Sequence, residues 1–417
     1  MMRWGIGPAL SRGLAGLTCV LAVSIAGPWR MAPASAEAPR PFVIGVSGDF
    51  SGPYVDVSGP GQLIAAQLAV EDFGGKVLGR PIVLRSADDQ NRPDIASANA
   101  RRWFDLDGAE AVVGGGNSTT AFAVLTAARQ AGRTFLVVGA GNPDFSGKEC
   151  SPISTQWAYD THAQAAATGV YLSRGQAAGS WFFITADYAF GHALERDTGQ
   201  AVTAAGGRVV GSVRAPLGTS DFSSFLLQAQ GSRATVIGLA VAGQDLINAI
   251  KQAGEFGLVS TGGQRLAGLS LMSNDIVGIG LSSAEGLVAS ESFYWDRTEE
   301  TRAWTRRFHA RLKDRIPNMV HAATYSAVLH YLRAVAAAGT ADARAVNARM
   351  RDMPINDFNN QNVRIRRDGR VLNPMYILRV KAPAASKDRF DVQEVVATLP
   401  AEQVFLSAEQ AGCRLAE

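Results

Sequence analysis

The sequence is poor in the residues on which catalytic, metal-binding and disulfide-rich proteins depend. Its 417 residues include only three cysteines and five histidines. Neither a Gly-x-Ser-x-Gly nucleophile motif nor a His-Glu-x-x-His zinc motif occurs in the chain. A secreted hydrolase, the alternative from another class, would need a nucleophile–base pair that the sequence does not show. We therefore expect a protein that is not an enzyme and that uses neither a metal nor another cofactor.

Long apolar runs are also scarce, and the one that stands out lies at the N-terminus. Arg3 and Arg12 accompany an apolar run over 13–27, which is too short to cross a bilayer comfortably. The small residues that end at Ala36 are typical of a signal-peptide cleavage site. Residues 1–36 are therefore predicted to be a secretory signal that is cleaved near Ala36 on export.

A strong excess of charge of one sign is missing as well. Lys and Arg number 40 against 37 Asp and Glu, and removal of the predicted signal takes away three arginines and no acid. A protein that binds nucleic acid regardless of sequence needs a net positive face. We therefore expect no nucleic-acid partner. The hydrophobic content of 47% excludes a disordered chain, and the length suggests two domains.

The cysteines agree with export. Cys19 lies in the predicted signal, and lipid attachment there is the weaker alternative because Thr18 is a poor residue to precede such a site. Cys150 and Cys413 remain as a pair, and an even count in an oxidising compartment predicts one disulfide. In the chain-entropy model, so long a loop gives up to about 5 kcal/mol of stabilisation. Two buried thiols are the alternative.

From residue 42 onward, short apolar runs alternate with stretches of helical periodicity. This alternation predicts parallel sheets that are covered by helices on both faces, in two α/β halves of similar build. The predicted strands lie at 42–46, 81–84, 111–113, 134–138, 181–184, 208–210, 235–239, 264–269 and 286–290.

The last part of the chain has a different pattern. Residues 362–366, the turn Asp368-Gly369 and residues 375–378 together predict an antiparallel hairpin. Four arginines in this region are expected to form a solvent-exposed basic face, with a docking surface as the minor alternative: Arg364, Arg366, Arg367 and Arg370.

The loop after the third predicted strand is the best candidate for a ligand site. Ligands of parallel sheets bind outside the carboxyl ends of the strands. Here a glycine run leads to Asn117, Ser118 and Thr119 at the start of a helix, where free N–H groups and hydroxyls suit a carboxylate. The alternative is that Asn117 or Ser118 only caps the helix.

The next loop contributes a second set of donors at Ala140, Gly141 and Asn142, although taken alone it resembles a turn. Neither loop fits a nucleotide-binding motif. Aromatic residues near the strand ends could enclose an apolar ligand body, although each taken singly is more often a packing residue. They are Tyr54, Trp157, Tyr188 and Phe190.

The order of several short motifs resembles the type I periplasmic solute-binding proteins of ABC importers, in the branched-chain amino-acid-binding branch. The resemblance runs from about Phe42 to the C-terminus. It is carried by Gly45-Val46, Ser51-Gly52, Ala87-Asp88-Asp89, Val113-Gly114, Asn117-Ser118-Thr119-Thr120, Thr185-Ala186-Asp187-Tyr188-Ala189-Phe190-Gly191 and Ser283-Ala284-Glu285-Gly286-Leu287.

The resemblance implies an α/β fold with two Rossmann-like lobes, which are joined by a three-stranded hinge and close on a ligand. It also implies a periplasmic location, an inner-membrane ABC permease as partner and, as we expect, a monomer. The implied first lobe is 37–157 with about 296–353, the second is 158–295 with about 354–400, and 401–417 is a tail tied to Cys150.

In this family the helix start and the following loop hold the ligand carboxylate, which corresponds to Ser118 and Asn142 with their neighbours. Amino-acid binders also place an acid after a second-lobe strand to hold the ammonium, but the corresponding stretch 266–271 has none. A buried ammonium without a counter-charge is costly. The favoured ligand is therefore an aromatic or keto acid. An amino acid remains an alternative ligand, because Asp187 or Asp245 could hold its ammonium in place of the missing acid. An amide or urea is a further alternative.

Overall fold

The computed structural model describes residues 39–173, 179–258, 263–313 and 315–415. The predicted signal and its cleavage site lie outside these residues. The part of the chain from Pro39 onward forms one compact unit. None of the described helices is both long and apolar enough to cross a membrane.

The first sheet has six strands in the order β2-β3-β1-β4-β5-β6, and only β2 runs antiparallel to its neighbour. Every residue of β1 and β4 is buried, which is typical of parallel strands covered on both faces. The strands are β1 (Phe42–Gly48), β2 (Lys76–Val77), β3 (Arg80–Asp88), β4 (Ala109–Gly114), β5 (Thr134–Val137) and β6 (Ser154–Gln156).

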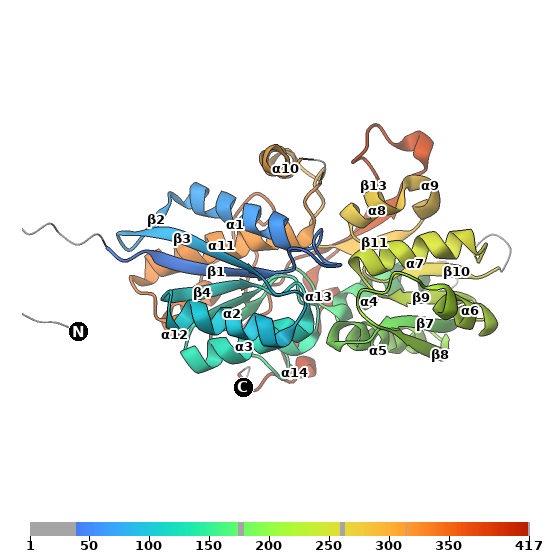
Figure 1. Ribbon diagram of the computed structural model, residues 1–417, viewed down its shortest axis with the longest axis horizontal. Helices are drawn as coiled ribbons and strands as arrows, with labels where there is room; N and C mark the ends of the chain where they lie inside the picture. The colour runs from blue at the N-terminus through green and yellow to red at the C-terminus, as the bar shows by residue number, and fades with distance from the viewer. Residues whose placement is uncertain (1–38, 174–178, 259–262, 314, 416–417) are drawn as a thin grey trace, which may run out of the picture. The chain divides into compact units, whose positions relative to one another are not determined.

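Six helices belong to this sheet, and three of them come from much later in the chain. The ring of Tyr331 on α11 lies 6.2 Å from that of Phe42 on β1, and Arg307 on α10 forms an ion pair with Asp72 on α1. We call this sheet and its helices the first lobe (Figure 1). The helices are α1 (Gly59–Phe73), α2 (Pro93–Asp105), α3 (Ser118–Ala131), α10 (Glu299–Arg311), α11 (Met319–Ala338) and α12 (Ala343–Asp352), with the short η1 (Pro143–Phe145).

The second sheet has four parallel strands in the order β10-β9-β7-β8, and with its helices it forms the second lobe. Its strands are β7 (Ser180–Ala186), β8 (Arg208–Ala215), β9 (Val236–Ala240) and β10 (Arg265–Gly268). Its helices are α4 (Thr161–Ser173), α5 (Ala189–Ala204), α6 (Ser223–Gly231), α7 (Gly243–Glu255), α8 (Ser273–Ile279) and α9 (Leu281–Ala284).

A third, antiparallel sheet corrects the predicted hairpin. β12 (Met375–Val380) pairs with β11 (Val288–Glu291) and β13 (Gln393–Leu399), and not with 362–366. Within that region Ile365 forms only an isolated bridge with Val371. Because most of β12 is buried, its main chain needs partners on both sides. One partner lies beyond the 3₁₀ turn η2 (Pro383–Ala385), outside the reach of a local pattern.

The predicted basic face is also wrong in part. Arg364 and Arg367 are exposed and Arg366 is half-buried, but Arg370 is 0% exposed. Buried main-chain carbonyls and carboxylates surround its guanidinium, as described below.

The predicted disulfide between Cys150 and Cys413 is present. It ties the C-terminal tail, with its short helices α13 (Ala401–Val404) and α14 (Ala408–Ala411), to the loop before β6. The chain passes between the lobes after β6, between β11 and α10, and between α12 and β12, and after β13 the tail returns to the first lobe, where the disulfide holds it. The predicted fold class is confirmed, whereas the residue limits assigned to the lobes stay a prediction.

Candidate functional site

The strand order places the ends of four strands around one crevice. In the first sheet β1 lies between β3 and β4, and in the second β7 lies between β8 and β9, so each sheet reverses its winding there. Loops that follow strands on either side of such a reversal diverge and leave room for a ligand. The loops after β1, β4, β7 and β9 are therefore the ones that should carry a site.

A small cavity lies where these loops meet. It leaves about 10 Å³ for the centre of a water-sized sphere, which is about the least that one water molecule needs. Its lining contains no acidic or basic side chain and four aromatic ones. The lining residues are Tyr54, Val57, Gly116, Ser118, Gly139, Gly141, Tyr159, Tyr188, Phe190, Ala242 and Met272.

The Asp49 carboxylate shapes the loop after β1. It accepts hydrogen bonds from the main-chain N–H of Gly52 (2.6 Å) and of Tyr54 (2.8 Å). Tyr54 is thereby held near the second lobe, where its hydroxyl lies 2.5 Å from that of Tyr188. Burial is the main cause that raises the pKa of Tyr54 and Tyr188, so both phenols are neutral at physiological pH and either can donate.

Two further aromatic rings complete the enclosure. Phe190 stacks on Tyr188 at 6.0 Å between centroids and meets Tyr159 edge-on at 6.5 Å. The Tyr159 hydroxyl donates to the Gly139 carbonyl at 3.1 Å, which fixes its ring. A Cβ at Gly141 would lie 2.6 Å from the Tyr159 ring and 3.0 Å from that of Phe190, so a side chain there would displace these rings.

The start of α3 provides the polar end of the cavity. The Asn117 side chain accepts from the N–H groups of Thr119 (2.7 Å) and Thr120 (3.3 Å), so it caps the helix. The Ser118 hydroxyl oxygen accepts from the Asn142 N–H at 3.2 Å, and its own proton can then point toward a ligand. Ser118 is thus the polar side chain that α3 presents to the cavity.

The structure brings some predicted site residues to the cavity and leaves others outside its lining. The Asn142 side chain accepts from the Asp144 N–H and donates to the Ala189 carbonyl at 3.4 Å. The Trp157 indole donates to Thr155 at 2.8 Å within the buried core. The cavity lining includes Tyr54, Ser118, Gly141, Tyr188 and Phe190, and does not include Asn117, Thr119, Ala140, Asn142 and Trp157.

Sequence reasoning missed several lining residues. Tyr159 lies two positions after the predicted Trp157, on the same segment, and an aromatic residue there was a usable signal. Ala242 and Met272 follow β9 and β10 and carry no polar group that would mark them.

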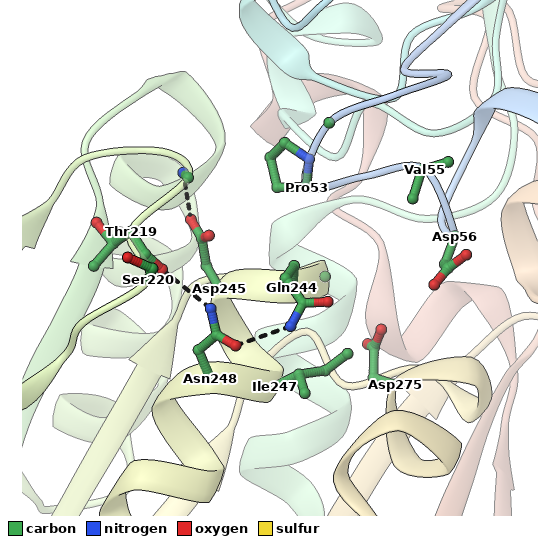
Figure 2. A pocket seen from close by; sticks show the side chains of 13 residues that line it. Pro53, Val55, Asp56, Thr219, Ser220, Gln244, Asp245, Ile247, Asn248 and Asp275 are labelled. Carbon is green, nitrogen blue, oxygen red and sulfur yellow. Dashed lines mark hydrogen bonds between the residues drawn. The ribbon is translucent and has the colours of Figure 1, made fainter.

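A second, larger cavity adjoins the first, and Figure 2 shows the residues that line it. Its volume is about 280 Å³, and it lies between the loop after β1 and the start of α7. Pro53 and Gly243 line it while the adjoining Tyr54 and Ala242 line the small cavity, so the two cavities share a wall. Among the described residues, no group of His, Cys, Asp and Glu is arranged to hold a metal ion.

Two buried carboxylates line this larger cavity. Asp245 accepts from the Gly218 N–H at 3.0 Å, and burial raises its pKa to about 6. Asp275 accepts from the Met272 N–H at 3.0 Å, and burial raises its pKa to about 7. Both acids therefore stand close to the small cavity, although neither lines it.

Direct contacts link the two lobes around these cavities. Besides the tyrosine pair, the Gln244 N–H donates to the Pro53 carbonyl at 3.1 Å. The Asn318 amide donates to Asn274 at 3.1 Å. The structure is therefore a closed arrangement, in which both lobes contribute to one enclosed space.

Comparison with known proteins agrees with this architecture. Residues 41–388 match a family model described as periplasmic binding protein, whereas no curated protein matches. A periplasmic binding protein from Burkholderia mallei is 45% identical, with 91% of this chain and 100% of that chain covered and a TM-score of 0.87. A branched-chain amino acid ABC transporter periplasmic ligand-binding protein from Burkholderia xenovorans is 36% identical, with 90% and 100% covered and a TM-score of 0.79.

A more distant match shares the fold alone. It is a solute-binding protein of an ABC transporter from R. palustris, in complex with benzoate, at 19% identity, 90% and 100% coverage and a TM-score of 0.78. The matched length and the identity to the Burkholderia proteins exceed what a shared fold requires. The chain therefore belongs to the periplasmic binding protein family, as a periplasmic solute-binding protein of the branched-chain amino-acid ABC transporter type.

Proposed function

We propose that this protein binds a small aromatic carboxylate between its lobes by hinge closure and delivers it to an inner-membrane ABC permease. It acts as an exported monomer after loss of residues 1–36, without catalysis and without a nucleic-acid partner. The observation that carries the ligand class is the lining of the small cavity, which combines four aromatic rings with Ser118 and contains no charged side chain.

The charge balance of this lining favours a ligand with one negative group. The Ser118 hydroxyl suits a carboxylate, at roughly 1.5–3 kcal/mol for a hydrogen bond to the charge, whereas Asn117 already binds the N–H groups of Thr119 and Thr120. An ammonium in the same space would face only hydroxyls and carbonyls, and an unpaired buried charge is strongly disfavoured. The rings of Tyr54, Tyr159, Tyr188 and Phe190 suit a flat apolar body.

The size of the cavity supports binding by opening and closure. A space of about 10 Å³ cannot admit an aromatic ring, so the lobes or the lining side chains must separate to take up the ligand. Phe190 and Tyr188 come from the second lobe, and Tyr54 and Ser118 come from the first. Rotation of one lobe away from the other would break the tyrosine contact and widen the cavity.

The predicted residues outside the lining have indirect roles in this proposal. Asn117 caps α3 and so fixes the direction of its N–H groups. Asn142 orients Ser118 through its main-chain N–H. For Thr119, Ala140 and Trp157, a ligand contact would require the lobes to rearrange. The R. palustris protein in complex with benzoate supports an aromatic acid as ligand.

An amino acid is the second candidate, and a specific observation favours it. Asp245 and Asp275 lie in the cavity next to the small one, and their shared wall consists of loop residues. If that wall moved on opening, an ammonium could reach one of these carboxylates. The printed description of the Burkholderia xenovorans protein, as part of a branched-chain amino acid transporter, is consistent with this candidate.

A thermal-unfolding panel separates the candidates. The mature protein is heated with benzoate, 4-hydroxybenzoate or phenylpyruvate, and in parallel with phenylalanine, leucine or benzamide. A ligand at 100 times its Kd stabilises the folded state by about 2.7 kcal/mol, which is readily seen as a higher melting temperature. We expect stabilisation by the acids. Stabilisation by the amino acids alone would reject the aromatic-acid proposal in favour of the second candidate.

A further inference from the structure

The main chain that first passes between the lobes has carbonyl groups without sheet partners. We call residues 157–160 the crossing segment, since they connect β6 of the first lobe to α4 of the second. Strand pairing ends at Gln156, so the carbonyls that follow have no sheet partner of the ordinary kind. Buried carbonyls nevertheless need a hydrogen-bond donor.

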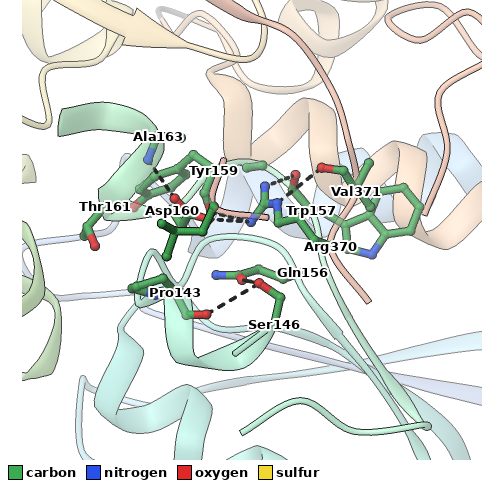
Figure 3. Close-up of polar contacts among 12 residues, drawn as sticks. Pro143, Ser146, Gln156, Trp157, Tyr159, Asp160, Thr161, Ala163, Arg370 and Val371 are labelled. Carbon is green, nitrogen blue, oxygen red and sulfur yellow. Dashed lines mark hydrogen bonds and ion pairs between the residues drawn. The ribbon is translucent and has the colours of Figure 1, made fainter. Parts of the chain in front are cut away.

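Two side chains from the later crossing between α12 and β12 supply these donors, and Figure 3 shows one of them, Arg370. The Arg370 guanidinium donates to the carbonyls of Trp157 at 2.9 Å and Tyr159 at 3.0 Å. The Asn373 amide donates to the carbonyl between them, that of Ala158, at 3.1 Å. Three consecutive carbonyls are thus bound by two side chains that lie more than 200 residues later in the sequence.

The charge of Arg370 is accommodated within this buried site. Its guanidinium lies 3.7 Å from the Asp160 carboxylate and 4.1 Å from the ring centre of Phe405. The buried Asp368 accepts from the Arg370 main-chain N–H at 3.0 Å. Burial lowers the pKa of Arg370 to about 10, against the opposing effect of the two carboxylates, so the side chain stays charged at pH 7.

The crossing segment in turn holds the loop that borders the small cavity. Tyr159 lines that cavity and donates to the Gly139 carbonyl. Directly after the segment, the Thr161 N–H donates to the Gly141 carbonyl at 2.7 Å. Asp160 accepts from the Ala163 N–H at 2.7 Å and so starts α4. A shift of the segment would therefore move both Tyr159 and the contact with Gly141.

We propose that Arg370 and Asn373 are positioning residues for ligand binding: by holding the carbonyls of the crossing segment, they set where Tyr159 and Thr161 stand against loop 139–142. This inference rests on the proposed function for the location of the ligand. The two side chains are not part of the cavity lining, and they act through the main chain that they bind, which includes the carbonyl of the lining residue Tyr159.

The alternative is that Arg370 only stabilises the fold, and Arg351 provides the matched control. The Arg351 guanidinium also donates to main-chain carbonyls, including those of Ser154 at 3.1 Å and Asn347 at 3.0 Å. These acceptors lie outside the crossing segment. A purely structural role predicts similar behaviour for the two arginines, whereas a positioning role predicts a difference.

The test compares Arg370→Lys, Arg351→Lys and the wild-type mature protein. Lysine keeps the positive charge but cannot donate to two carbonyls in the fork geometry of arginine. Amide hydrogen exchange at Thr161 and Ala163 is measured without ligand, and the Kd for benzoate is measured well below each melting temperature. For Arg370→Lys we expect the amide exchange rates at Thr161 and Ala163 and the Kd for benzoate each to rise about tenfold or more. For Arg351→Lys we expect a lower melting temperature with both values as in the wild type.

The inference would be overturned if the amide of Thr161 exchanged at the same rate in Arg370→Lys as in the wild type. It would also be overturned if this exchange rate rose while the Kd for benzoate stayed unchanged. If Arg370→Lys does not fold, Asn373→Ser, which loses one neutral hydrogen bond, is measured in the same way with the same deciding outcomes. If benzoate does not bind the wild-type protein, the proposed ligand class fails, and exchange at Thr161 still decides whether Arg370 positions the segment.

Discussion

Replacement of Gly141 with alanine would place a methyl group in the wall of the small cavity. The new Cβ would lie 2.6 Å from the Tyr159 ring and 3.0 Å from the Phe190 ring, both shorter than normal contact distances. Tyr159 cannot swing away freely, because its hydroxyl is bonded to the Gly139 carbonyl. Phe190 can move away only with the second lobe. The contact with Phe190 is therefore specific to the closed form, whereas the contact with Tyr159 persists when the lobes open.

The expected size of this effect follows from the cost of overpacking. An extra methyl group in a packed site costs about 1–3 kcal/mol. The contact with Phe190 adds its share of this cost to the closed, ligand-holding form alone, and a share of about 1–3 kcal/mol raises the Kd by about 5-fold to 150-fold, since 1.4 kcal/mol corresponds to a factor of ten. The ligand-free melting temperature should also fall, because the contact with Tyr159 does not depend on closure.

Isothermal titration with the acid that gives the largest thermal shift measures the Kd of Gly141→Ala against the wild type. Gly254 on α7 is the matched control, since a Cβ there meets nothing within 4 Å. Gly254→Ala should leave the Kd unchanged and stabilise the helix slightly. A Gly141→Ala protein that binds as tightly as the wild type would show that ligand closure does not bring Tyr159 and Phe190 together at this glycine.

Three further predictions rest on separate features. Ser118→Ala should weaken binding of the carboxylate by about 1–3 kcal/mol in titration calorimetry, since a buried bond to a charge is lost; an unchanged affinity would reject Ser118 as a carboxylate ligand. Replacement of Cys150 and Cys413 with serine should lower the unfolding free energy by up to about 5 kcal/mol in denaturant titrations, and an unchanged value would exclude a stabilising bond. Burial raises the pKa of Glu291 to about 7, above its unfolded value, so its contribution to stability is fully present below about pH 4.5 and is lost as the pH rises through 7. Glu291→Gln should therefore flatten the fall in melting temperature between pH 5 and pH 8, and an unaltered slope would show that Glu291 does not titrate in this window.

The strands of the two parallel sheets could be predicted because their signal is local. Each buried parallel strand is a short apolar run that ends in a glycine-rich or polar loop, as at Val112-Val113-Gly114. The pairing of β12 could not be predicted in this way. Its two partners are β11, more than 80 residues earlier, and β13, which follows a turn. The Asp368-Gly369 turn suggested a nearer partner, and burial on both sides of β12 overrode it.

The candidate site was predictable to the extent that it follows strand ends. Tyr54, Ser118, Tyr188 and Phe190 were found because they combine a position after a strand with a side chain that can bind. Asn117 and Asn142 share that position, but their side chains serve the ends of α3 and η1. Sequence cannot separate these two uses of an amide, because a helix cap and a ligand contact require the same residue type at the same place.

Arg370 illustrates a more general reason why sequence falls short in a protein of two lobes. A segment that passes from one sheet to another leaves the ladder that satisfied its carbonyls, and the new donors must come from side chains. In this protein they come from the later crossing, in a run of arginines that resembles a solvated surface. Only the three-dimensional pairing of the two crossings shows that Arg370 is 0% exposed and donates to Trp157 and Tyr159. We therefore expect the binding properties of this protein to depend on Arg370 and Asn373 as well as on residues that line the cavity.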